Sequence, residues 1–190
     1  MSLFEIFLIG CGLAMDAFAL SCCKGSAVPH VSGRHMCAAG VWFGAFQILM
    51  ALAGYFLAGT FAKYIQEYDH WIAFVLLCAA GVIMFIKAAR GLENEKQEYD
   101  PFAAGAMLKA AVSAGIGTFA AGIVFCFLKV NIWLAADVAG VAAFALSAAG
   151  VKTGSVFGVN SCRKAEAAGG AVIIIVGLRV LLSHFGIIDY

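Results

Sequence analysis

The sequence predicts an all-α integral membrane protein of six transmembrane helices, arranged as two inverted three-helix repeats. Of the 190 residues, 64% are hydrophobic and only 12% are charged, and the mean hydropathy is +0.98. A soluble domain carries roughly 25% charged residues, because its surface must face water. Long apolar runs alternate with short polar segments, and the two halves of the chain resemble each other. We therefore expect one membrane domain over residues 1–190, with the lipid bilayer as its main partner.

Each apolar run is long enough to cross a bilayer, which takes about 20 residues of helix. Pro29 and Pro101 lie in the polar gaps, so the helix interiors contain no proline. Glu5 and Asp16 argue against a cleavable signal peptide, which would have a basic start and an uncharged apolar segment. The predicted helices cover residues 3–23, 36–60, 71–89, 107–128, 133–151 and 167–186.

Basic residues are concentrated in alternate loops. Loops two and four hold only Lys63 and Lys129, and Arg179 lies in the last helix. The positive-inside rule then predicts that loops one, three and five face the cytoplasm and that both termini lie outside. The basic residues of these three loops and their flanks are Lys24, Arg34, Lys87, Arg90, Lys96, Lys109, Lys152, Arg163 and Lys164.

The second half of the chain echoes the first. Residues 15–19 (MDAFA) align with residues 116–120 (IGTFA). We place repeat one at about 1–90, a cytoplasmic linker at about 90–106 and repeat two at about 107–190. Three helices are an odd number, so the repeats must cross the membrane in opposite senses, as in many secondary transporters. Chance recurrence of short Ala, Gly and Phe strings is the alternative. The further aligned pairs are Gly54 with Gly150, Phe61 with Phe157 and Gly81 with Gly177.

Asp16 is the strongest candidate for a binding residue. A carboxylate inside an apolar helix is costly and is seldom kept without a function. Its hard oxygens suit Mn²⁺, Mg²⁺, Ca²⁺ or a proton relay. Gln47 and Thr118 lie at a similar depth, about 16 Å from the cytoplasmic face against about 10 Å for Asp16. We therefore expect Asp16, Gln47 and Thr118 to contribute to one metal site; a protonated Asp16 that only bonds a neighbouring helix is the alternative.

Two weaker candidates follow. Asp137 is expected about 6 Å below the outer face, where it could line a vestibule or simply favour a helix start. On the cytoplasmic side, a set of soft ligands could bind a metal, although its spacing matches no closed zinc motif. This set comprises Cys22, Cys23, His30, His35 and Cys37.

Several functions have no support in the sequence. The chain contains no phosphate-binding Gly-Lys-Ser/Thr loop, no Gly-x-Ser-x-Gly and no His-Glu-x-x-His. The formal net charge of +1 gives no indication of nucleic-acid binding. We therefore expect a protein that is not an enzyme, holds no permanent cofactor and draws on a proton gradient or the membrane potential. The oligomeric state is open.

The segment Gly12–Gly25, GLAMDAFALSCCKG, resembles the bacterial manganese efflux pump family. The resemblance continues through HWIAFVLL at 70–77, LKVNI at 128–132, RKAEAAGG at 163–170 and SHF at 183–185. It implies a six-helix exporter of Mn²⁺ in the bacterial inner membrane. It also implies that Asp16 is an acidic residue used in transport.

The chain departs from this family pattern at several membrane positions. Gly117 stands where the second repeat of the family carries Asp, and Gln47 stands where the family usually has Glu. Lys87 and Ile83 replace an acidic residue and an Arg. These changes lower the negative charge available to a divalent cation. Two alternatives therefore stay open: a transporter of another small cation or solute, and a structural or regulatory membrane protein that does not transport.

Overall fold

The structure is a computed structural model that describes residues 3–28, 30–65, 69–90 and 100–184. All regular structure in these ranges is helical, which confirms the prediction of an all-α protein. The helices are α1 (Leu3–Ser26), α2 (Gly33–Ile65), α3 (Asp69–Arg90), α4 (Ala104–Phe127), α5 (Ile132–Phe157) and α6 (Val159–His184).

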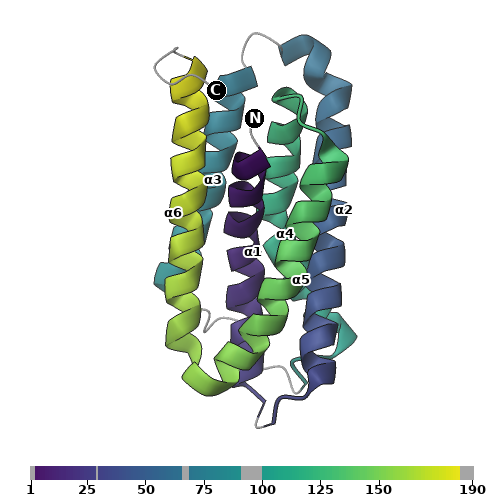
Figure 1. The fold of residues 1–190 in the computed structure, drawn as a ribbon, viewed down its shortest axis with the longest axis vertical. Coiled ribbons are helices and arrows are strands. Elements are labelled where there is room, and N and C mark those ends of the chain that lie inside the picture. Colours follow the sequence, from purple (N-terminus) through teal and green to yellow (C-terminus); the bar gives the residue numbers. More distant parts are fainter. Residues whose placement is uncertain (1–2, 29, 66–68, 91–99, 185–190) are drawn as a thin grey trace.

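The helices run up and down along one axis (Figure 1). The start of α1 and the end of α6 lie at one end of the bundle, which we call the terminal end. The last residues of α1, α3 and α5 lie toward the opposite end, which we call the loop end. α1 packs against α5 and α6, α2 packs against α4 and α5, and α3 packs against α6 and α4. Successive helices run in opposite directions, so α1, α3 and α5 run from the terminal end to the loop end, and α2, α4 and α6 run back.

Large apolar side chains cover the outside of the bundle. Within the residues that the structure describes, five helices are long and apolar enough to cross a membrane. Water cannot solvate so many exposed apolar groups in a monomer, whereas lipid tails can. The bundle is therefore a multi-pass membrane protein. Its exposed apolar residues include Phe56, Val75, Ile116, Val141, Phe157 and Ile175.

Some helix ends differ from the sequence prediction. Residues 152–166 were expected to form a loop, but α5 continues to Phe157 and α6 begins at Val159. This prediction was wrong because polar and small residues continue a helix as readily as they form a loop. The turn is made at Gly158, whose φ of 69° is accessible to glycine without strain. As a result, Glu166 lies within α6 instead of preceding it.

Lys24 fixes α1 to the start of α4 at the loop end. This lysine is buried, and its Nζ donates to the carbonyl oxygen of Pro101 at 3.0 Å and that of Ala106 at 3.4 Å. A buried ammonium needs such acceptors because it has left water. The contact orders the entry to α4 beside the end of α1.

Glycines allow several helix pairs to approach closely. A Cβ on Gly54 of α2 would collide with the backbone of Phe119 in α4, and a Cβ on Gly150 of α5 would meet the carbonyl of Phe18 in α1. Gly154 likewise lies against the backbone of Cys22. Small residues drive helix association in lipid because they let backbones pack directly. These contacts place α1 against α5 and α2 against α4.

We predict that Gly54→Ala lowers the stability of the bundle by about 2 kcal/mol, because overpacking a close contact forces α2 away from α4. The control is Gly59→Ala on the same helix, where the nearest neighbour of a new Cβ is the Cys126 sulfur at 3.9 Å. Thermal unfolding of the purified protein in detergent measures both variants. Equal midpoints for the two variants would contradict the close packing at Gly54.

Candidate cation site

Asp16 lies in the middle of α1 and is 4% exposed. Its Oδ2 accepts a hydrogen bond from Lys87 Nζ at 2.9 Å, and its Oδ1 accepts from the same Nζ at 3.3 Å. Lys87 belongs to the last turn of α3, 71 residues away in sequence. The carboxylate is therefore held by a cation from another helix.

Lys87 also reaches a third helix. Its Nζ donates to the carbonyl oxygen of Ser113 in α4 at 3.4 Å. The Lys87 side chain is 26% exposed, whereas that of Asp16 is 6% exposed. The lysine thus approaches a buried carboxylate from a less buried position and joins α1, α3 and α4.

Glu166 is the functional candidate that sequence reasoning missed. It is 0% exposed on α6, and both its carboxylate oxygens lack a hydrogen-bond partner among the described residues. It is close enough to Asp16 and Lys87 to interact electrostatically with both. A buried carboxylate without hydrogen bonds is costly and attracts a cation or a proton. The segment RKAEAAGG was the available signal, but its first four residues, 163–166, were assigned to a loop.

The Asp16–Lys87 ion pair thus lies near a second buried carboxylate, that of Glu166 on α6, which interacts with the pair through space without a hydrogen bond. If all three are ionised, the local charge is −1, which favours an additional cation. Carboxylate oxygens are hard ligands that suit Mn²⁺, Mg²⁺ and Ca²⁺. Asp16 and Glu166 therefore offer the anionic oxygens that a cation site at this position would need.

A cavity of about 270 Å³ opens beside the Asp16–Lys87 pair. It lies between α1, α3 and α4, and its lining includes Asp16, Lys87 and Gly117. A Cβ on Gly117 would meet only a Leu13 methyl group, at 3.5 Å. Because Gly117 has no side chain, part of the cavity next to the Asp16–Lys87 pair stays unfilled.

Gln47 and Thr118 are both buried, as expected for polar residues at membrane depth. Gln47 Nε2 and Thr118 Oγ1 have no hydrogen-bond partner within the described ranges. Thr118 shares a face of α4 with Gly115 and Gly122, which both pack against α2. The Asp16 carboxylate is hydrogen-bonded by Lys87 of α3. A ligand shell that Asp16 shares with Gln47 and Thr118 therefore stays a prediction.

Asp137 is exposed on α5, five residues after the helix begins at the terminal end. An exposed side chain is what a residue lining an outer vestibule would require, so the vestibule role stays a prediction.

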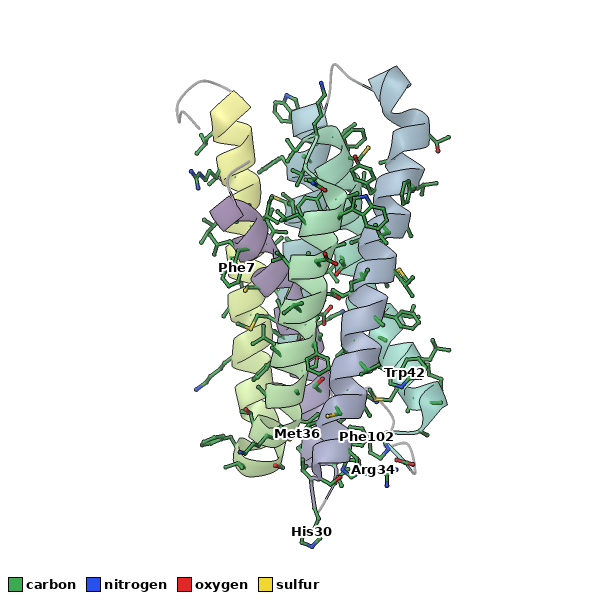
Figure 2. All side chains as sticks on the ribbon, turned by 45° about the vertical axis from the view of Figure 1, so that its right-hand side comes forward. Phe7, His30, Arg34, Met36, Trp42 and Phe102 are labelled. Carbon is green, nitrogen blue, oxygen red and sulfur yellow. The ribbon has the colours of Figure 1, made fainter. Side chains whose placement is uncertain are left out.

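The soft-ligand residues are spread over the loop end. Cys22 is buried and disulfide-bonded, so its sulfur offers no thiolate. Cys37 is exposed, and the His35 ring stacks on Phe102 with 4.6 Å between ring centroids. Figure 2 shows His30 at the tip of the loop, beyond Arg34 and Phe102. In the described part of the chain, no three His, Cys, Asp or Glu side chains are grouped to hold a metal.

Comparison with known proteins identifies the family. The family model described as "Putative manganese efflux pump" matches residues 30–181. A relative of that name from Acetivibrio thermocellus is 40% identical over 190 residues, covering 100% of this chain and 96% of the relative. Another, from Bifidobacterium adolescentis, is 41% identical over 184 residues, covering 97% and 98%. A third, from Desulfitobacterium hafniense, is 43% identical over 182 residues, covering 96% and 95%.

No solved structure matches the chain significantly. The sequence matches nevertheless extend over nearly the full length of this chain and of its relatives. Since the family model covers most of the chain and the helical bundle agrees with these matches, the chain belongs to the manganese efflux pump family.

Proposed function

We propose that this protein is a secondary transporter that exports Mn²⁺ from the cytoplasm of a bacterium across its inner membrane. The observation that carries the proposal is the buried Asp16 carboxylate, which already holds a cationic group at 2.9 Å. A membrane interior that stabilises an ammonium at this point can hold a metal cation there as well. The names of the relatives support Mn²⁺ as the cargo.

Asp16 and Glu166 are the proposed anionic ligands of Mn²⁺. Both are buried and on different helices, and Glu166 has carboxylate oxygens without hydrogen bonds in the described part of the structure. Gln47 and Thr118 are proposed as neutral ligands on the path of the ion, because buried polar groups without partners can replace water around a cation. Hard oxygen ligands of this kind suit Mn²⁺.

Alternating access by two inverted repeats is the proposed mechanism. The contacts of aligned glycines support it: Gly54 packs on Phe119 while its counterpart Gly150 packs on Phe18. Phe18 and Phe119 are themselves aligned positions in the two halves. Such reciprocal contacts are expected when a pseudo-two-fold axis relates the halves.

The third helix of each half supports the same relation. Gly81 of α3 packs on Ile174 of α6, while its counterpart Gly177 lies against Leu77 and the Cys78 backbone. Ile174 and Cys78 are also separated by the offset that aligns Gly177 with Gly81. The α3–α6 contact is therefore nearly the same when the halves are exchanged.

We further propose that the loop end faces the cytoplasm and that both termini lie outside. Lys24, Lys87, Lys109 and Lys152 lie near the loop ends of their helices, in agreement with the positive-inside rule. Asp137 then lies at the outer mouth, where its charge favours a departing cation.

We predict that Asp16→Asn abolishes manganese resistance in a strain that lacks its own exporter, because the main anionic ligand is lost. Cellular manganese should equal that of cells without the protein. Asp100→Asn, an exposed residue outside the helices, is the control and should behave as wild type. Since Asp16→Asn leaves the partly buried Lys87 ammonium without its carboxylate partner, the double variant Asp16→Asn/Lys87→Gln tests the same loss without an unpaired charge. Normal export by a double variant present at wild-type level would refute the role of Asp16.

We predict that Glu166→Gln weakens Mn²⁺ binding about tenfold or more, because carboxylate charge sets the affinity of oxygen-ligand sites. Transport of Mn²⁺, Mg²⁺, Ca²⁺ and Na⁺ into proteoliposomes measures both the affinity and the choice of ion. The same panel tests whether the cargo is a different small cation. An unchanged Mn²⁺ affinity in Glu166→Gln would remove Glu166 from the site.

A further inference from the structure

Lys87 occupies the place that a bound metal ion needs. Its Nζ lies 2.9 Å and 3.3 Å from the two oxygens of Asp16. Lys87 also interacts electrostatically with the buried Glu166 carboxylate, although no hydrogen bond joins the two. The cation-binding groups of the site are therefore engaged by a cation that belongs to the protein.

We propose that Lys87 is a tethered competitor of the transported cation: its ammonium holds Asp16 while the site is empty and withdraws when Mn²⁺ binds. This inference rests on the proposed export of Mn²⁺ and adds a mechanism to it. A divalent ion and an ammonium repel each other strongly at contact distance in a medium of low dielectric constant. The two cannot share the Asp16 oxygens, so binding of one requires departure of the other.

Space beside the pair lets the Lys87 ammonium move away from Asp16, and one carbonyl oxygen stays within its reach. The 270 Å³ cavity beside the pair is bounded by Lys87 itself and by α4 near Gly117. The carbonyl oxygen of Ser113, at 3.4 Å, offers the ammonium another acceptor. A lysine stem has four flexible bonds, and this side chain is 26% exposed, so it is not confined by packing.

Charge balance favours the exchange. Asp16 and Glu166 carry −2 when ionised, and Mn²⁺ neutralises both once Lys87 has left. With no metal bound, Lys87 partly neutralises the pair, so the empty site does not hold two uncompensated carboxylates in the bilayer. An uncompensated buried charge would oppose the conformational change of an empty carrier. Lys87 thus lowers the affinity for Mn²⁺ but permits the protein without Mn²⁺ to change back to the conformation that faces the cytoplasm.

These two effects predict an unusual phenotype for Lys87→Gln. Removing the competitor should tighten Mn²⁺ binding about tenfold, as expected for loss of a charge-assisted contact. Net Mn²⁺ export should fall about tenfold or more, because the empty site loses its counter-charge. Exchange of Mn²⁺ on one side for Mn²⁺ on the other should persist, because the protein carries an ion in both directions and never has to change conformation with an empty site.

The test uses purified protein in proteoliposomes loaded with Mn²⁺. Net efflux into Mn²⁺-free buffer and exchange against external radioactive Mn²⁺ are measured for each variant. Lys87→Arg keeps a competing charge and should retain net efflux. Lys152→Gln, an exposed lysine of α5, is the matched control and should equal wild type in both assays.

A second measurement needs no substitution. Amine-reactive labelling of wild-type protein, followed by mass spectrometry, reports the accessibility of each lysine. Mn²⁺ should increase the labelling of Lys87 and leave that of Lys152 unchanged. This readout is independent of whether Lys87→Gln folds.

Tighter binding with selective loss of net efflux, together with Mn²⁺-dependent labelling of Lys87, would support the proposal. Unchanged affinity and efflux in Lys87→Gln, loss of exchange together with efflux, or labelling of Lys87 that ignores Mn²⁺ would each overturn it. If wild type transports Mn²⁺ in these experiments, the proposed function stands even when the lysine mechanism fails. If wild type shows neither efflux nor exchange of Mn²⁺, both proposals are refuted.

Discussion

The ion pair between Asp16 and Lys87 is the interaction on which the proposed cation site depends, and it links α1, α3 and α4. A carboxylate taken from water into a bilayer loses several kcal/mol of hydration, and only a close counter-charge with hydrogen bonds offsets this loss. The 2.9 Å contact supplies that charge, and the Ser113 carbonyl supplies another acceptor for the ammonium. We propose that the transported cation binds at the same place, because the Asp16 carboxylate stabilises positive charge there.

Glycine packing is what brings the site together. The direct contacts of Gly154 and Gly150 with α1 hold that helix against α5. Gly169 of α6 would place a Cβ against Met15 and the Gly12 carbonyl of α1. α6 therefore lies close enough to α1 for Glu166 to act on Asp16. Bulky side chains at these positions would separate the two carboxylates.

Much of the fold could be predicted from the sequence, because membrane helices are encoded in long apolar runs. The all-α bundle of six helices was predicted and is confirmed, and Asp16 lies inside an apolar helix as expected. The partner of Asp16 could not be predicted, because Lys87 is 71 residues away and only tertiary packing brings it near. Glu166 was missed because hydropathy cannot separate a polar helix start from a loop. The ligand role of Gln47 and Thr118 stays a prediction.

The central claim is that Mn²⁺ binds at Asp16 inside the membrane, and electron paramagnetic resonance of the purified protein tests it most directly. The signal of free hydrated Mn²⁺ should fall as the ion binds, with a single site per chain in the wild-type protein. The double variant Asp16→Asn/Lys87→Gln, which removes the pair without leaving an unpaired charge, should leave the free-ion signal unchanged. Equal Mn²⁺ binding by the double variant and the wild type would contradict the claim, as would a wild-type protein that binds no Mn²⁺.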